Sequence, residues 1–210
     1  MGRAKLTYHH GDLKGALISV ATEMIAAEGQ AGFSLRKIAQ QVGVSQTALY
    51  RHFANKEELF AAIAEQGFLR LSEKSQQAFD NHSDLIERTI EVGMAYLDFA
   101  AENPNLYRLM FDSSIADNQR YTALADARRQ AFKYSALNSA ALRRLRDPDA
   151  EPDSLQAEST KILSQALVHG LASLMIEGMI HSRVERKELM RKTLSESLRF
   201  PWLTESERQV

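Results

Sequence analysis

The sequence predicts an all-α protein of about nine helices, with an amino-terminal three-helix helix-turn-helix domain followed by a larger helical domain. Three observations support this: helix-favouring residues dominate, only 4 prolines and 10 glycines interrupt 210 residues, and apolar residues recur at helical spacing. The chain holds no cysteine, which excludes disulfide scaffolds, thiol catalysis and cysteine-bound zinc. We expect no metal and no cofactor.

Charge is distributed unevenly along the chain, although its net value is only −1. Residues 1–56 carry seven basic and three acidic side chains, a balance of +4 that leaves −5 for the rest. The basic segment is therefore the part expected to meet a polyanion. The longest uncharged run, 162–176, has 15 residues, fewer than the roughly 20 of a membrane-spanning helix. We expect a cytoplasmic protein with no membrane partner.

Three helices are predicted within residues 1–56, the first domain. The first helix begins at Leu13 and stops before Gly29, because apolar side chains between them repeat every three or four positions. Ser34 and Ser45 each follow an apolar residue and are placed as N-caps, so each starts a short helix. Gly43 can take the left-handed conformation that ends the second helix. Two capped helices are thus joined by a tight turn.

Residues 57–210 are predicted to form the second domain. A start signal at Asn55 and Glu58 begins a linker helix, Pro104 stops a later one, and a polar segment with two prolines at 147–154 is the clearest loop. The predicted helices are 56–80, 83–102, 106–111, 118–146, one after the loop that ends near residue 181, and 185–199.

Residues 34–53 read SLRKIAQQVGVSQTALYRHF, the layout of a helix-turn-helix whose second helix enters a DNA major groove. Gln46 and Thr47 stand at the leading end of that helix, where side chains reach base edges and glutamine can pair with adenine. Tyr50, Arg51 and His52 follow with donors suited to phosphate oxygens. Two amphipathic helices around a glycine also occur in proteins that bind no DNA, so the layout alone leaves both interpretations open.

The run VGVSQTALYRHFANKEELF at 42–60 resembles the signature of the TetR family of one-component transcriptional regulators. The resemblance covers about residues 8–60 and implies a homodimeric repressor that binds a palindromic double-stranded DNA operator and is released by a small-molecule effector. It assigns base reading to the start of the second helix and makes Leu49 and Phe53 core residues. The candidate DNA contacts are Ser34, Arg36, Ser45, Gln46, Thr47, Tyr50, Arg51, His52 and Lys56.

A second resemblance covers parts of the remainder. YHHGDLKGALI near the start, PNLYRLMF at 104–111 and ALVHGLASLMIEG at 166–178 are similar to a TetR subgroup with a Trp-His-Gly type carboxy-terminal domain. Gln165 stands about where the tryptophan would be.

An apolar effector pocket is predicted in the second domain, because aromatic and methionine side chains that adapt to irregular apolar shapes concentrate there. His169 is a candidate polar anchor. The alternative is that these side chains simply fill the core. The candidate ligand contacts are Tyr96, Phe99, Tyr107, Met110, Phe111, Phe132, His169 and Met175.

Apolar residues between 162 and 180 cover more than one helical stripe, so we expect a second apolar face that pairs in a homodimer. Small residues would let the helices approach closely, and the alternative is complete burial within one subunit. The candidate interface residues are Ala166, Gly170, Leu174 and Gly178.

Other functions find less support in the sequence. His169, Ser173, Glu177 and His181 are spaced by four and could share a metal-binding helical face, but the Glu-x-x-His pair of di-iron bundles does not occur. His9 and His10 fit an amino-terminal arm beside DNA. Enzyme motifs such as G-x-S-x-G, H-E-x-x-H and the P-loop do not occur either, so we expect no enzyme. A helical ligand-binding or scaffolding module, a TetR-like activator and a nonspecific DNA binder remain alternatives.

Overall fold

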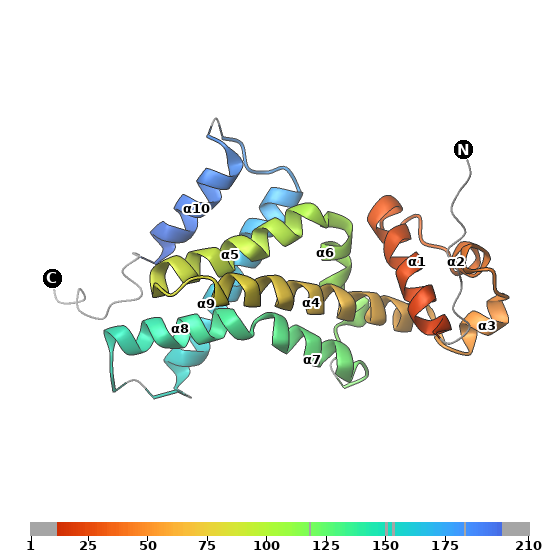
Figure 1. Cartoon of the computed structure of the whole chain (residues 1–210), viewed down its shortest axis with the longest axis horizontal. Coiled ribbons are helices and arrows are strands. Elements are labelled where there is room, and N and C mark those ends of the chain that lie inside the picture. The colour runs from red at the N-terminus through yellow and green to blue at the C-terminus, as the bar shows by residue number, and fades with distance from the viewer. Residues whose placement is uncertain (1–11, 118, 150, 153, 183, 199–210) are drawn as a thin grey trace. The chain divides into compact units, whose positions relative to one another are not determined.

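The computed structural model describes residues 12–198 apart from 118, 150, 153 and 183. Every regular element within these residues is a helix, which confirms the predicted fold class (Figure 1). None of them is long and apolar enough to cross a membrane. The elements are α1 (Leu13–Glu28), α2 (Leu35–Val42), α3 (Gln46–Tyr50), α4 (Lys56–Asp80), α5 (Leu85–Glu102), α6 (Pro104–Met110), the 3₁₀ turn η1 (Ser113–Ile115), α7 (Thr122–Ala131), α8 (Lys133–Arg146), α9 (Leu155–Ile176) and α10 (Arg186–Ser197).

The helices group into two compact units. The first unit, 1–68 and 103–127, combines α1, α2, α3 and the start of α4 with α6, η1 and the start of α7. The second unit, 69–102 and 128–210, combines the remainder of α4 and the end of α7 with α5, α8, α9 and α10. The single helix α4 therefore contributes residues to both units.

The start signals of the short helices have the predicted structure. The Ser34 hydroxyl accepts a hydrogen bond from the backbone N–H of Lys37 at 3.4 Å, and the Ser45 hydroxyl accepts one from Ala48 at 3.1 Å. Gly43 adopts φ 81° and ψ 29°, the left-handed conformation that ends α2. These confirm the two N-caps and the turn between them, and they fix where α3 begins.

The start of α4 is held by two hydrogen bonds that involve Glu58. The Asn55 side-chain oxygen accepts from the Glu58 N–H at 2.9 Å, and the Glu58 carboxylate accepts from the Ala54 N–H at 2.7 Å. Two otherwise unsatisfied N–H groups are thereby bonded, as in a capping box. The 25-residue helix that follows contributes residues to both units.

The core of the first unit lies beneath the short helices. Ile38 of α2 and Leu49 of α3 are completely buried, and Phe53 is 3% exposed, which confirms Leu49 and Phe53 as core residues. The edge of the Phe33 ring packs against Phe60, with ring centroids 4.6 Å apart. The Asn105 side chain of α6 donates to the Ala26 carbonyl at 3.0 Å. The hydrophobic contacts and this bond hold α1, α2, α3 and α6 as one body.

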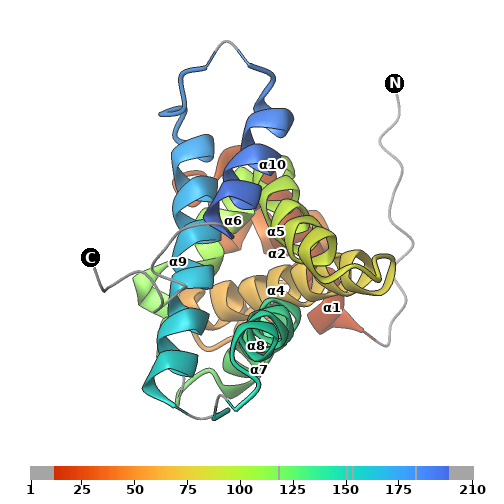
Figure 2. The same cartoon turned by 90° about the vertical axis from the view of Figure 1, so that its left-hand side faces the viewer.

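The second unit is built around α5, which packs against α8, α9 and α10 (Figure 2). Gly93 permits a close approach of α10, because a Cβ atom there would lie 2.9 Å from a methyl carbon of Leu194. The Arg191 guanidinium of α10 pairs with Glu87 and Glu91 of α5. These contacts fix the last helix against the centre of the unit.

The single helix predicted over 118–146 is wrong. The chain forms α7 and α8 instead, interrupted at Phe132, whose φ of −95° and ψ of 1° are not helical. The Phe132 ring packs against Tyr96 with centroids 5.9 Å apart. This tertiary contact accompanies a break that no proline or glycine marks in the sequence.

Two other predicted boundaries need correction. The helix expected to reach about residue 181 ends at Ile176, because Gly178 takes a left-handed φ of 69°. His181 therefore does not continue the helical face of His169. The helix expected at 106–111 begins earlier, at Pro104, since proline at the first helical position forfeits no hydrogen bond.

The conformation of Gly43 gives a direct stability test. Gly43→Ala should lower the free energy of unfolding by about 1–2 kcal/mol, because a side chain disfavours the left-handed region; no atom within 4 Å would otherwise clash with the new Cβ. Gly43→Asn is the matched control and should lose less, since asparagine tolerates this region. Chemical denaturation measures both, and an equal loss would contradict the backbone explanation.

Candidate nucleic-acid interface and ligand pocket

The predicted base-reading side chains lie on the outside of α3. Gln46, Thr47, Arg51 and His52 are exposed, and the Tyr50 side chain is 51% exposed. Leu49, on the opposite side of the same helix, is completely buried and anchors it from below. The structure therefore presents the polar side chains of α3 and the turn after it to solvent, where a DNA groove could reach them.

Ser34, Arg36 and Ser45 lie at the starts of α2 and α3. Arg36 and Ser45 are exposed and Ser34 is half-buried. The two serine hydroxyls already cap their helices, so each positions the backbone of a helix start and still retains a lone pair or proton for a further bond.

The Lys56 ammonium sits against two aromatic rings at the first turn of α4. Its Nζ lies 5.3 Å from the Phe33 ring centroid and 4.7 Å from that of Phe60. Both distances suit cation–π attraction. The positive charge next to the helix-turn-helix is therefore held in a defined place, although the flexible lysine stem would otherwise allow many positions.

Asp112, in the turn after α6, supplies a negative group to the same unit. Hydrogen bonds from the side chain and the backbone of Ser114 hold the pKa of this carboxyl below its usual value, with smaller contributions from Gln30 and Lys56. Its other oxygen accepts from the Gln30 amide at 3.0 Å. The bond ties the loop after α1 to the turn after α6.

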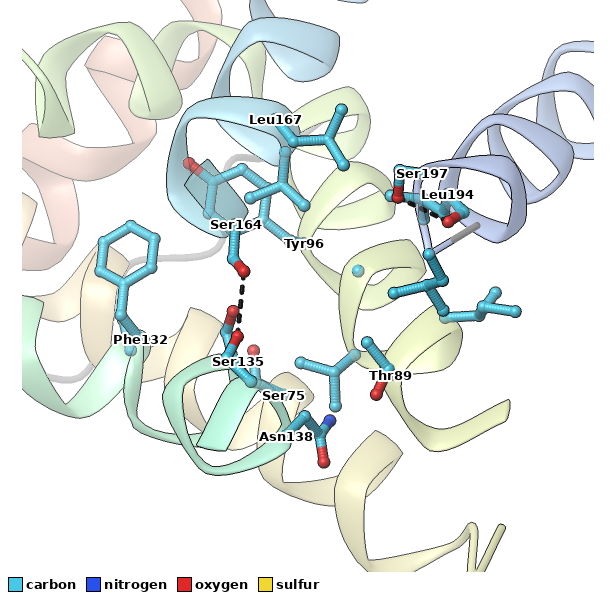
Figure 3. Close-up of a pocket in the computed structure, with 17 residues that line it drawn as sticks. Ser75, Thr89, Tyr96, Phe132, Ser135, Asn138, Ser164, Leu167, Leu194 and Ser197 are labelled. Atoms are coloured by element: carbon cyan, nitrogen blue, oxygen red, sulfur yellow. Dashed lines mark hydrogen bonds between the residues drawn. The ribbon is translucent and has the colours of Figure 1, made fainter. Parts of the chain in front are cut away.

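A pocket of about 80 Å³ lies within the second unit, among the end of α4, α5, α8, α9 and α10 (Figure 3). Its apolar wall includes Ile90, Val92, Phe132, Leu167, Val168 and Leu194. Six hydroxyls also line it: Ser75, Thr89, Ser135, Ser139, Ser164 and Ser197. Tyr96 and Asn138 complete the polar groups. Among the described residues, no charged side chain lines this pocket.

The predicted ligand contacts do not gather in one place. Tyr96 and Phe132 line the pocket. Phe99, His169 and Met175 belong to the same unit without lining it. The other three, Tyr107, Met110 and Phe111, belong to the first unit. Sequence reasoning missed the hydroxyls altogether, because serine is common on helices and carries no periodic signal.

His169 does not line the pocket, but it contacts Tyr96, which does. Its Nδ1 lies 3.5 Å from the Tyr96 hydroxyl, whose side chain is part of the pocket wall. Burial lowers the pKa of His169, since an imidazolium loses solvation there. The neutral form is therefore favoured beside the pocket.

The predicted dimer residues lie on or near the exposed side of α9. Leu174 is 44% exposed and Ala166 is exposed. A Cβ atom at Gly170 would meet nothing within 4 Å. Gly178 is exposed as well, but it lies beyond the end of the helix. Ile162 and Leu163, 63% and 48% exposed, extend the apolar surface toward the start of α9.

One candidate metal cluster occurs among the described residues: His82, Glu87 and Glu91 offer ligand atoms within 4.8 Å of one another. The Arg191 guanidinium binds both carboxylates, and the His82 Nδ1 is 2.8 Å from the Ala78 carbonyl. The Arg191 guanidinium therefore balances the negative charge of the two carboxylates, so the cluster needs no metal ion. His9 and His10 lie outside the described residues.

An exposed helix-turn-helix joined to a helical unit with an internal pocket defines a helical DNA-binding regulator. Residues 17–63 match the family described as bacterial regulatory proteins, tetR family, and residues 89–196 match the tetracyclin repressor-like C-terminal domain. The chain belongs to the TetR family. This confirms the resemblance of residues 42–60 to the TetR family and places the protein among DNA-binding regulators, not enzymes. The likeness to the subgroup with a Trp-His-Gly type carboxy-terminal domain stays a prediction.

Curated relatives include the nucleoid occlusion factor SlmA of Vibrio vulnificus, 36% identical over 118 residues, and that of Vibrio cholerae, 33% identical over 119 residues. Each match covers 56% of this chain and 59% of the relative, so the chain spans about three fifths of these relatives' length.

Solved structures agree with the fold over nearly the whole chain. A protein of unknown function from a Rhodococcus species has a TM-score of 0.72 at 26% identity, covering 92% of this chain and 96% of that one. The TetR-family regulator PfmR from Thermus thermophilus has a TM-score of 0.60 at 19% identity, covering 87% and 97%. At that identity the second likeness concerns the fold alone.

The lowered pKa of His169 predicts a pH dependence of stability. Because the unfolded chain protonates this imidazole more readily than the folded one, stability should fall as the pH drops below about 6.5, the ordinary histidine value. His169→Gln should flatten the melting temperature between about pH 7.5 and pH 5. His181→Gln, at an exposed histidine, is the control and should keep the parental slope. A His169 variant with that same slope would contradict the burial effect.

Proposed function

We propose that the protein is a ligand-responsive transcriptional repressor that binds a palindromic operator as a homodimer and is released by a small, mainly apolar effector. The observation that carries this proposal is the surface of α3, which exposes Gln46, Thr47 and Tyr50 around the buried anchor Leu49. Its supports are the basic balance of residues 1–56 and the family match over 17–63.

In this proposal some of the exposed polar side chains read bases and the others bind phosphates. Gln46 and Thr47 enter the major groove and read base edges. Tyr50, Arg51 and His52 bind phosphates and set the register of the helix. The remaining phosphate contacts come from the helix starts and the fixed ammonium, namely Ser34, Arg36, Ser45 and Lys56.

Dimerisation is proposed on α9, where Leu174 and Ala166 are exposed and Gly170 leaves open space. Gly178 would then lie at the edge of the interface, after the helix end. A two-fold pair places two recognition helices about 34 Å or a multiple apart, so both read one palindrome. Linking two weak half-site contacts multiplies the affinity.

Effector release requires a ligand that binds one conformational state more tightly than another. A coupling of about 1–3 kcal/mol would change operator affinity 5- to 150-fold. Because α4 contributes to both units, a shift of this helix is the proposed link between pocket and DNA. Of the ligand contacts predicted from the sequence, Tyr96 and Phe132 line the pocket, and we propose these two as effector contacts. The other predicted contacts do not line it: Phe99, Tyr107, Met110, Phe111, His169 and Met175.

A second candidate comes from the curated relatives, whose name describes nucleoid occlusion. A factor of that kind could bind many chromosomal sites and need no effector. Mapping of binding sites across the genome separates the two: one or a few sites near promoters support the repressor, and many dispersed sites support the alternative. An activator would bind the same DNA and raise transcription, while a scaffolding module would bind none.

Substitutions on the DNA surface should separate base reading from phosphate binding. Gln46→Ala should change the preference at one base pair per half-site by about 1–3 kcal/mol. Lys56→Ala should weaken all sequences alike and lower the salt slope of log K by about one unit. Lys187→Ala, at an exposed lysine of the second unit, is the control and should leave both unchanged. Fluorescence anisotropy titrations measure the DNA dissociation constants. If Gln46→Ala keeps the preferred sequence of the parent protein, Gln46 does not read a base.

The exposed side of α9 should set the oligomeric state. Leu174→Arg should convert a dimer to a monomer at micromolar concentration, because a charge would be buried in an apolar interface. Ile86→Arg introduces the same charge on α5 at a residue of similar exposure, 42%, and should remain dimeric. Sedimentation velocity decides between them, and a monomeric parent protein would remove the claim.

A further inference from the structure

Most polar groups in the pocket wall are already satisfied by the protein. The Ser139 and Ser164 hydroxyls lie 2.9 Å apart and bond each other. The hydroxyls of Thr89 and Ser197 each donate to a backbone carbonyl of their own helix at 2.7 Å. These groups shape the wall, and a ligand would have to break a bond to engage their protons.

Two hydroxyls differ from the others. Ser75 of α4 is only 2% exposed, and Ser135 of α8 is half-buried. Neither has a hydrogen-bond partner within the part of the chain that the structure describes, and both line the pocket (Figure 3). Neither oxygen is sealed off without a partner, as the Tyr121 hydroxyl is among the described residues. Both are open to the pocket, so each can bond to a polar atom supplied by whatever fills it.

In the described part of the chain, the pocket wall has no charged side chain that could neutralise the charge of an ionic ligand. Arg88 stands behind Asn138, but its Nε donates to the Asn138 oxygen at 2.9 Å and its guanidinium lies 4.4 Å from the Phe79 ring centroid. A carboxylate or ammonium would therefore lose its water without gaining an opposite charge.

The volume limits the size of the ligand. One water takes roughly 10–15 Å³ of such a volume, so a pocket of about 80 Å³ holds roughly five to eight waters. This corresponds to an organic molecule of about five to eight non-hydrogen atoms. Phe132 and Tyr96, whose ring centroids lie 5.9 Å apart with the planes tilted by 38°, provide an aromatic wall for a single ring.

We infer that the pocket takes a compact, uncharged, mostly apolar molecule that bears one hydroxyl or carbonyl group, and that Ser75 and Ser135 bind this group. The ligand class is argued from the pocket alone, and only the role of this ligand as an effector rests on the proposed function. A serine hydroxyl both donates and accepts, so alcohols, phenols and ketones all fit. Carboxylates and amines do not.

Four probes that share one scaffold test the inference: benzyl alcohol, toluene, benzoate and benzylammonium. Dissociation constants are measured by methyl NMR titration of the full chain at neutral pH. We expect the alcohol to bind at least about tenfold more tightly than either ion, because only the ions must be desolvated with their charge. An ion that binds as tightly as the alcohol, or failure of both neutral probes to bind, would overturn the inference.

The double variant Ser75→Ala and Ser135→Ala tests the two hydroxyls. It should lose about three- to tenfold in affinity for the alcohol and nothing for toluene, which makes no hydrogen bond. Ser159→Ala, at an exposed serine of α9 away from the pocket, is the matched control. Equal losses for both probes, or no loss for the alcohol, would contradict the assignment.

Thermal unfolding shows that any loss is not a folding defect. Ser75→Ala should melt no lower than the parent protein, because the hydroxyl that it removes makes no hydrogen bond to the described residues. A lower melting temperature would show that the hydroxyl is satisfied within the protein and would overturn its role. Release of bound DNA is measured in parallel. Selective binding of the alcohol without DNA release leaves the ligand class intact and refutes the effector role, whereas release by an ion refutes the ligand class alone.

Discussion

The burial of Leu49 is the contact on which the DNA-facing surface depends. The recognition helix α3 has only five residues, too few to be stable in water on its own. Its conformation is imposed by the completely buried Leu49 below, by the Ser45 cap at its start and by the Gly43 turn before it. The exposed polar side chains owe their common orientation to these three features, so the surface and the core of the first unit cannot be varied independently.

The same dependence makes α4 important. This helix begins at the capping bonds made by the Asn55 and Glu58 side chains. It carries Lys56 on two aromatic rings and supplies Ser75 to the pocket wall. A lysine proposed to meet phosphate and a serine proposed to meet the effector thus share one helix. If binding at one end biases its position, linkage requires that DNA weaken the ligand by the same factor as the ligand weakens DNA.

Local signals explain which parts of the fold could be predicted from the sequence. Ser34, Ser45, Gly43 and the Asn55 pair act within four residues of themselves, so their caps and turns followed from spacing alone. The break at Phe132 could not be predicted, because it coincides with a contact to Tyr96, 36 residues away in the chain. For the same reason the hydroxyls of the pocket were not predicted: they come from α4, α5, α8, α9 and α10, and only the tertiary fold brings them together with Tyr96 and Phe132, which were. The DNA surface was proposed in full because α3 and its flanks are contiguous in sequence.

Sequence-specific binding of duplex DNA is the central claim, and one retardation measurement tests it most directly. The full chain is titrated at about 0.15 M salt against the region upstream of its own gene and against random duplex of equal length. We expect the upstream DNA to bind at least about 10³-fold more tightly, in a complex that holds two copies of the chain. Equal affinity for both duplexes would contradict the claim, because charge attraction alone would then account for all binding.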